Sequence, residues 1–491
     1  MKNRRGLLQL EGLTERIVPA VSIRTVDGDL VISGIPNLQG TTQNLWINVT
    51  SDNEVTIRDG GTTVTSTGIN RGTYAVTGDL ILNLSNRNDS VVIDFTATAE
   101  LDGNIIATLN NGNDTLSITN SGAADASILG DVTVFGGNGT DVLSINNTGN
   151  ATTTLLVGGI VSFNGGAGVD TMNANGTSSV AGTNAAELVI GNGLVMTQVN
   201  TFNVATATTG AATASAPVTI DGNITFNSSV DKLIGNSVNF GSAVSTATLA
   251  GALTITGGQG SDTIIWNQLS VVDVIPAEDT VLEVSVNLGL GTNNLTLTDT
   301  VIGIGGTDAD FAYTGGTGTD NIILTGGGNS ISGSVTVTLG KGTNTYQDSD
   351  TAYDKNVTIT GGDNADTITM DSADIGGLLS ASLGKGANGF DLNTGSTVAG
   401  GLTYVGGSGV DTVDIATGDD LAGDVTISLG AGADDLVLSG FTTGNIQLTS
   451  LTVDLGVDSL IDTVDYDSVL STDGIWSDPL NLGFTDDVNA V

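Results

Sequence analysis

Acidic side chains recur behind glycine-rich turns, and they are the residues of this sequence best suited to chemistry. The motif GGxGxD occurs five times, and a looser copy, GAGAD, ends at Asp434. Carboxylate oxygens and the carbonyl oxygens of such turns are hard ligands of the kind that calcium prefers. The candidate metal ligands are the aspartates that close these motifs, namely Asp141, Asp170, Asp262, Asp320, Asp411 and Asp434. Calcium is the one cofactor that the sequence suggests.

The glycine motif resembles the calcium-binding nonapeptide GGxGxDxUx of RTX proteins, and the stretch GGQGSDTII from Gly257 matches it throughout. In RTX rolls the nonapeptides follow one another in tandem, and each ion is held between consecutive turns. Here a copy recurs only about once per two repeats. The resemblance therefore implies calcium most strongly where acidic corners are neighbours, at the pairs Asp141/Asp170 and Asp411/Asp434.

A second interpretation of these corner residues is structural. A corner Asp or Asn can turn inward and accept hydrogen bonds from backbone N–H groups, as asparagine ladders do in β-helices. The corner residue follows the same odd and even spacing as the apolar positions around it, which favours this interpretation. Both interpretations remain open on the sequence alone.

A repeated unit of strand, corner and strand must position these residues. From Val335 to Gly440 five copies follow one another, with corner residues Asn344, Asp366, Asn388, Asp411 and Asp434. The corners are evenly spaced, at roughly 22 to 23 residues per copy. A fixed period of this length with alternating strands and no helical pattern is typical of a β-solenoid. We predict an all-β parallel β-helix with rungs of about 22–27 residues, paired into repeats of about 46 residues.

The columns of the repeat predict which side chains face inward. Residues two apart in a strand share a face, so Val335, Val337 and Leu339 and their equivalents should stack in the core. The aromatic residues Tyr313, Tyr346, Phe390 and Tyr404 fall in inward columns, whereas Tyr353 does not.

Asn alternates with Asp at the corners from Asp262 to Asp411, and Leu alternates with Gly five residues earlier. Stacked strands lie roughly 4.8 Å apart, so an intervening Asn should separate two carboxylates and donate an amide hydrogen bond. Lys341, Asp363 and Lys385 should form a short surface ladder of alternating charge.

Composition excludes several classes of function. The formal net charge is −41, from 12 basic and 53 acidic residues, so binding to nucleic acid or to an anionic membrane surface is not expected. The chain has no Cys and no His, which removes disulfides, thiol catalysis and the commonest general base. We therefore expect no catalytic residues and no enzyme activity. No apolar run is long enough for a transmembrane helix.

The chain divides into four segments. Residues 1–20 resemble the short LExLExRxxPA sequence of large planctomycete proteins through Leu10, Glu11, Leu13, Glu15, Arg16, Pro19 and Ala20, and this resemblance implies export. Residues 21–100 should hold a β-rich cap and first rungs, and residues 101–457 the parallel β-helix. Within it, residues 176–250 lose the corner motif and are interpreted as degenerate rungs, four of which would fill the gap from Asp170 to Asp262. Residues 458–491 form an acidic cap or tail, with Trp476 and Phe484 as capping candidates.

These features predict an extracellular or cell-surface protein with a structural role. The favoured function is a non-catalytic solenoid, such as a surface-layer, adhesin or fibre-like module. Stabilisation by calcium is an open addition to it, which depends on the interpretation of the corner residues. The alternative is a carbohydrate-binding or polysaccharide-degrading β-helix. Possible partners are other copies of the chain or a surface polysaccharide.

Overall fold

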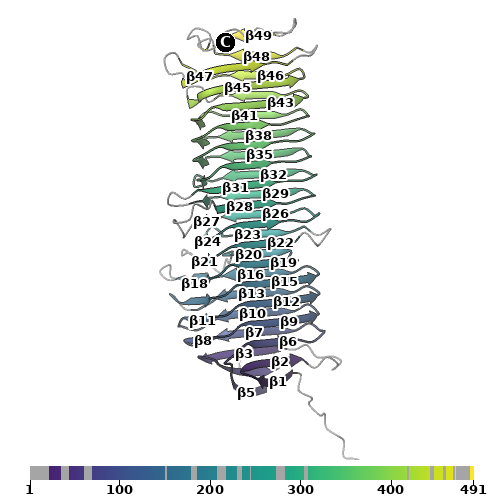
Figure 1. Cartoon of the computed structure of the whole chain (residues 1–491), viewed down its shortest axis with the longest axis vertical. Coiled ribbons are helices and arrows are strands. Elements are labelled where there is room, and N and C mark those ends of the chain that lie inside the picture. The colour runs from purple at the N-terminus through teal and green to yellow at the C-terminus, as the bar shows by residue number, and fades with distance from the viewer. Residues whose placement is uncertain are drawn as a thin grey trace, which may run out of the picture.

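A computed structural model of the chain describes residues 21–34, 44–59, 69–149, 152–178, 185–206, 217–228, 235–243, 245–272, 282–303, 308–416, 420–442, 447–456, 461–467, 470 and 487–490. The described residues form an all-β parallel β-solenoid, in which the chain winds upward and each turn pairs with the turns before and after it (Figure 1). The predicted fold class is confirmed.

Three stacks of parallel strands form the sides of the solenoid. Face A contains β2 (Asp29–Gly34), β6 (Leu80–Asn83), β9 (Ile105–Asn111), β12 (Val132–Asn138), β15 (Val161–Ala167), β19 (Leu194–Thr197), β22 (Ile224–Asn227), β25 (Leu253–Thr256), β28 (Leu282–Asn287), β31 (Ala309–Thr314), β34 (Val335–Thr338), β37 (Val357–Thr360), β40 (Leu379–Ser382), β43 (Leu402–Ser408), β45 (Ala422–Ala431) and β47 (Gln447–Asp454). Face B contains β3 (Asn44–Ser51), β7 (Ser90–Phe95), β10 (Thr115–Asn120), β13 (Val142–Asn147), β16 (Thr171–Asn175), β20 (Thr201–Val204), β23 (Ser237–Phe240), β26 (Thr263–Asn267), β29 (Asn293–Thr298), β32 (Asp320–Thr325), β35 (Asn344–Ser349), β38 (Asp366–Asp371), β41 (Gly389–Leu392), β44 (Thr412–Ile415), β46 (Asp435–Leu438), β48 (Thr463–Tyr466) and β49 (Asp487–Ala490). Face C contains β8 (Ala99–Leu101), β11 (Ala126–Ile128), β14 (Thr154–Val157), β18 (Ala185–Ile190), β21 (Val218–Asp221), β24 (Ala247–Ala250), β27 (Leu269–Val271), β30 (Val301–Ile302), β33 (Ser330–Ile331), β36 (Ala352–Tyr353), β39 (Asp374–Ile375) and β42 (Thr397–Val398).

The twelve strands from β8 to β42 give about twelve turns in which all three faces are present. On face A the strand register leads in fourteen steps from Leu80 to Leu451. Successive turns therefore lie about 27 residues apart on average. The spacing is shortest in the regular stretch after Val335, where Val335 pairs with Val357 and Val357 with Leu379, at roughly 22 residues per turn.

The segment with degenerate motifs holds fewer turns than its length suggests. Thr171 pairs with Thr201, Thr201 with Ser237, and Ser237 with Thr263. Three steps therefore span the gap from Asp170 to Asp262, and the prediction of four was wrong. The reason is that the connecting loops here are longer, so each turn uses about 26 to 36 residues rather than about 23.

The two ends of the solenoid pair differently. At the N-terminal end β1 (Val21–Val26) pairs antiparallel with β2, and β3, β4 (Glu54–Asp59) and β5 (Ile69–Ala75) form an antiparallel meander. At the other end β48 and β49 continue face B in parallel register. Residues 1–20, Trp476 and Phe484 lie outside the described residues. Within the described part, no helix is long and apolar enough to cross a membrane.

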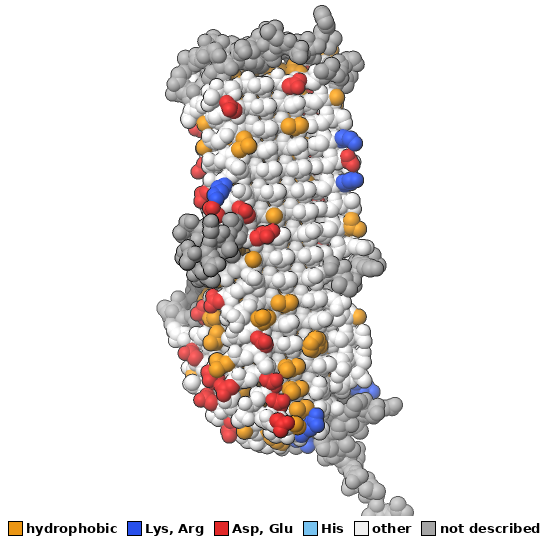
Figure 2. Space-filling model, viewed as in Figure 1, with side chains coloured by type: hydrophobic (Ala, Val, Ile, Leu, Met, Phe, Trp, Pro, Cys, Tyr) orange, Lys and Arg blue, Asp and Glu red, His pale blue; other side chains and the backbone are white. Residues whose placement is uncertain are grey.

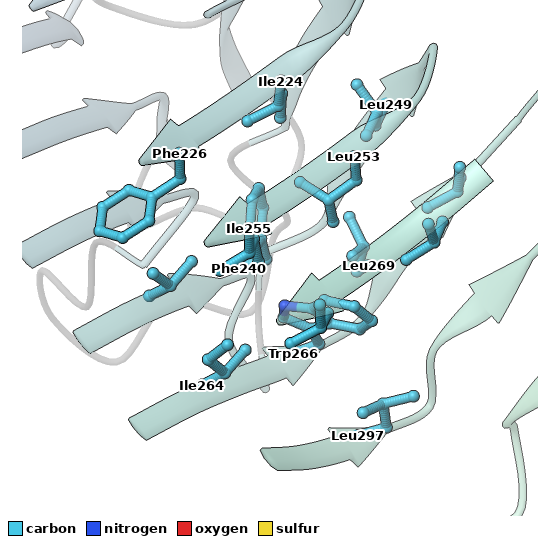
Figure 3. Packing of buried hydrophobic residues seen from close by; sticks show 14 of the residues in the cluster. Ile224, Phe226, Phe240, Leu249, Leu253, Ile255, Ile264, Trp266, Leu269 and Leu297 are labelled. Atoms are coloured by element: carbon cyan, nitrogen blue, oxygen red, sulfur yellow. The ribbon is translucent and has the colours of Figure 1, made fainter. Parts of the chain in front are cut away.

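The core is one continuous stack of apolar side chains from all three faces. Figure 3 shows Ile255 of face A, Trp266 of face B and Leu269 of face C pointing into the same interior. Aromatic rings add edge contacts along the axis, with the ring centroids of Phe240 and Trp266 6.4 Å apart. The predicted inward columns are confirmed, since Val335, Val337 and Leu339 and their equivalents are buried, apart from the partly exposed Gly361.

Tyr353 contradicts its predicted position, because its side chain is only 2% exposed. It lies on the two-residue strand β36, where the sequence offers too few alternating positions to show which face is inward. Tyr313, Tyr346, Phe390 and Tyr404 are buried as predicted.

The side of the rod visible in Figure 2 is sparsely charged for so acidic a chain, and most of it carries neither charged nor apolar side chains. The predicted ladder of alternating charge is present: Lys341 Nζ and Lys385 Nζ lie 3.8 Å and 3.5 Å from carboxylate oxygens of Asp363. All three side chains are more than half exposed, so each pair contributes about 0–1 kcal/mol.

Candidate functional site: a buried ladder of aspartate and asparagine

A single column of acidic and amide side chains follows the corner between faces A and B. Each member immediately precedes, or begins, a strand of face B, so the parallel register stacks them one above another. All are 0–5% exposed. We call this column the corner ladder; its members are Asp89, Asp114, Asp141, Asp170, Asn200, Asn236, Asp262, Asn293, Asp320, Asn344, Asp366, Asn388, Asp411, Asp434 and Asp462. It contains all six predicted site residues.

Most ladder residues accept a hydrogen bond from the backbone of the turn before them; the exceptions include Asn236, whose Oδ1 is buried without a partner, and Asp320, which accepts the side-chain amide of Asn293. The N–H group of Asp89 donates to Oδ1 of Asp114 at 2.6 Å, and that of Asp114 donates to Oδ1 of Asp141 at 2.9 Å. The same bond joins Asp411 to Asp434 at 2.7 Å. A buried N–H group without an acceptor costs about 1–3 kcal/mol, so these side chains stabilise every corner that they cap. The prediction that corner residues turn inward and accept hydrogen bonds from backbone N–H groups is confirmed for these residues.

The amide members separate carboxylates, as predicted. Asn344 Nδ2 donates to Oδ1 of Asp366 at 2.7 Å, and Asn388 Nδ2 donates to Oδ1 of Asp411 at 3.0 Å. Asn293 makes the equivalent bond to Asp320 at 2.8 Å. Each amide thus gives the next carboxylate a second donor, and a charged acceptor makes the stronger hydrogen bond.

The first glycine of GGxGxD makes room for the second carboxylate oxygen. A Cβ atom built on Gly136 would lie 2.7 Å from Oδ2 of Asp141, and on Gly361, the first glycine of the looser copy GGDNAD, it would overlap Oδ2 of Asp366. Asp366 Oδ2 accepts the N–H of Gly362 at 2.9 Å. The carboxylate therefore folds beneath the glycine turn, where a larger side chain would collide with it. On turns with a corner Asn, a buried Leu such as Leu339 fills this position instead, which explains the paired alternation of Gly with Leu and Asp with Asn.

Burial raises the pKa of six ladder carboxylates, Asp114, Asp141, Asp262, Asp320, Asp366 and Asp411. Burial raises the pKa of Asp114 to about 7; the N–H of Asp89 lowers it, and the charges of Asp141 and Asp89 raise it further. Burial likewise raises the pKa of Asp320 to about 6, against hydrogen bonds from Asn293 and Gly316. Oδ2 of Asp114 and Oδ2 of Asp141 are buried without a hydrogen-bond partner, so both carboxyl groups favour a bound proton.

The corner ladder offers calcium few ligands. Calcium takes six to eight oxygens, whereas each turn brings one carboxyl group to the corner, and its Oδ1 already accepts an N–H group. Among the described residues, no group of three or more His, Cys, Asp or Glu side chains is placed to hold a metal ion. The donor set therefore fits calcium poorly. Coordination at the six predicted aspartates stays a prediction.

Sequence reasoning missed three ladder members, Asn200, Asn236 and Asp462, because the glycine turn before them is lost. The residues that follow each of these corners do show the repeat. The stretches NTFNV, NSVNF and DTVDY have the same order as DTLSI after Asp114, with a small polar residue and then alternating apolar ones.

A second buried polar cluster lies where the sequence predicted an apolar column. Tyr353 donates to Oδ2 of Asp348 at 2.9 Å, the hydroxyls of Tyr346 and Tyr353 are 2.7 Å apart, and Thr351 donates to Oδ1 of Asp348. Burial raises the pKa of Asp348 to about 6, although the bonds from Thr351 and Tyr353 lower it. All four side chains are at most 2% exposed, so the cluster joins faces B and C inside the core and cannot touch a ligand.

Replacing Asp366 by Ala should destabilise the solenoid by about 2–4 kcal/mol, because Asn344 N–H, Asn344 Nδ2 and Gly362 N–H would each lose a hydrogen bond to a carboxylate. Gly362 N–H would be left without an acceptor, whereas the two Asn344 donors would keep bonds to backbone carbonyl oxygens. Chemical denaturation at pH 7 measures this change. The matched control is Asp363→Ala on the same turn, which removes an exposed carboxylate and should cost at most about 1 kcal/mol. Equal effects of the two variants would contradict the capping role.

Comparison with protein-family models, with curated proteins and with solved structures finds no match to this chain. What the geometry establishes is a β-solenoid with a stacked, buried ladder of aspartate and asparagine.

Proposed function

We propose that the chain is a non-catalytic structural solenoid that presents an extended surface outside the cell, as a surface-layer, adhesin or fibre-like module. The observation that carries this proposal is the corner ladder itself. Its chemically active side chains lie inside the rod and bind the backbone of neighbouring turns, so they serve the stacking of the rod.

Burial also argues against the polysaccharide-cleaving alternative. Glycoside hydrolysis needs two carboxyl groups that flank a bound sugar, and the ladder carboxylates are at most 3% exposed. Asp434 and Asp435 are adjacent in sequence, but Asp434 is buried in the ladder while Asp435 faces outward on β46. Binding of a surface polysaccharide without cleavage, and association between copies, remain compatible proposals.

Two measurements test the proposal. Incubation with a panel of soluble polysaccharides should release no reducing ends, and turnover of any of them would overturn the structural role. Thermal unfolding followed by circular dichroism should give a cooperative β-sheet melt, with the same melting temperature in EGTA, in millimolar magnesium and in millimolar calcium.

A calcium-selective rise in melting temperature would instead show that the ion binds the folded state, because a ligand that binds only the folded state stabilises it. That result would establish calcium binding to the folded chain and favour the predicted sites. It would leave the proposal of a non-catalytic role standing.

A further inference from the structure

One side of the solenoid carries a regular array of hydroxyl groups. On face A the outward residues form two columns that run in parallel register from β22 to β45. The first column is Thr225, Thr254, Ser285, Ala312, Thr336, Thr358, Ser380, Thr403 and Thr426; the second is Asn227, Thr256, Asn287, Thr314, Thr338, Thr360, Ser382, Val405 and Ser428. We call these two columns the hydroxyl face.

The hydroxyl face is uncharged and open to solvent. Fourteen of its eighteen residues are Thr or Ser, eight in the first column and six in the second, and none is charged. Within the part of the chain that the structure describes, none of these fourteen hydroxyls makes an internal hydrogen bond, and all are partly or fully exposed. The acidic residues of the same strands, such as Glu283, Asp310 and Asp424, lie outside the two columns.

Face B is also uncharged on its outward side from β26 to β35, but it differs from the hydroxyl face at other turns. Its Asn173, Asn203 and Asn239 are hydrogen-bonded to one another along the stack at 2.8 Å, and farther along Asp391 lies directly opposite Asp414. The hydroxyl face is thus a long uncharged strip on face A in a chain of net charge −41, and a neutral partner fits it best.

The spacing of the array indicates a periodic partner. Neighbouring turns are about 4.7–4.9 Å apart, and residues two apart along a strand are separated by about 6.6 Å. In ice, tetrahedral O–H···O bonds of about 2.75 Å place second-neighbour oxygens about 4.5 Å apart, with a perpendicular repeat of about 7.3 Å. Both spacings agree within about 10%, which small side-chain rotations can absorb.

We propose that the hydroxyl face binds ice. Each turn adds another pair of outward side chains in the same register. The number of contacts with an ice surface therefore grows with the length of the array. The six side chains of β34, β37 and β40 (Thr336, Thr338, Thr358, Thr360, Ser380 and Ser382) form its uninterrupted centre. Toward the N-terminus, the exposed apolar residues Val195 and Phe135 occupy the first and second columns and interrupt the polar array.

Slow freezing of a dilute solution of the full chain tests this binding, since an ice-binding protein enters the growing crystal and others are excluded. The test variant is Thr360→Tyr, which raises a bulky ring on the hydroxyl face. The matched control is Thr367→Tyr on face B, an exposed Thr of the same turn. Unchanged circular dichroism melts establish that both variants fold.

The expected result is that the unsubstituted chain and Thr367→Tyr enter the ice and slow recrystallisation, whereas Thr360→Tyr loses both effects. Exclusion of the unsubstituted chain from ice, at the level of albumin, would overturn the inference, as would equal behaviour of the two variants. Binding to insoluble cellulose or chitin that only Thr360→Tyr abolishes, without entry into ice, would assign the face to a polysaccharide and also overturn it.

Discussion

Replacement of Asn344 and Asn388 together by Asp is expected to lower the melting temperature strongly at pH 8 and only slightly at pH 4. The two amides now donate to Asp366 and Asp411 at 2.7 Å and 3.0 Å. With carboxyl groups in their place, five carboxylates would follow one another from Asp320 to Asp411, each about 4.8 Å from the next. Like charges at that separation in the core repel strongly.

Asp114 provides the scale of the effect, because burial and, after it, the charges of two neighbouring carboxylates raise its pKa to about 7. A carboxyl group shifted from 3.8 to about 7 costs about 4 kcal/mol of stability once it is ionised, so the two substitutions together should cost several kcal/mol at pH 8. At pH 4 the new carboxyl groups are protonated, and their O–H groups can replace the lost amide donors.

The control for this double substitution is Asn364→Asp, which adds a negative charge at an exposed corner position of the same region. It should shift the melt very little at either pH. Added salt or calcium should partly restore the doubly substituted chain at pH 8, because counterions reduce the repulsion. An unchanged melt at pH 8 in low salt would contradict direct stacking of the ladder.

The fold was predictable because the five copies after Val335 repeat with almost constant length. In that stretch a residue such as Ile359 shows its inward position through alternation alone, and the corner residues align without gaps. The hydrogen bonds that the side-chain amides of Asn344 and Asn388 donate to carboxylates were predictable too. An Asn between two stacked Asp residues separates their charges and offers a donor, whatever the exact path of the corner.

Other features depend on contacts between faces, which a repeat does not encode. Asp348 stands in a column of apolar residues, and only the approach of Tyr353 from face C supplies it with a partner. Similarly, the length of each turn between Asp170 and Asp262 is set by connecting loops whose sequences carry no common motif, so the number of turns could not be derived by dividing the gap by a constant turn length.

Neutralising one buried carboxylate should stabilise this acidic chain. Asp114 has a folded pKa of about 7, well above the 3.8 of an exposed carboxyl group. A raised folded pKa contributes stability that is fully present below the unfolded pKa and is lost as the pH rises through the folded one. The chain should therefore be more stable at pH 4 to 5 than at pH 8, and for Asp114 the difference is on the order of 4 kcal/mol.

Asp114→Asn isolates this contribution from the general repulsion of a chain with net charge −41. An Asn at this corner can still accept the N–H of Asp89 and can donate to Oδ1 of Asp141, as Asn344 does to Asp366. We expect a higher melting temperature than the unsubstituted chain at pH 8, the same temperature at pH 4, and a smaller dependence on pH between them. Asp371→Asn removes an exposed charge from β38 and should leave that dependence unchanged. If both substitutions flattened the pH profile equally, overall charge rather than the buried ladder would govern the acid stability of the rod.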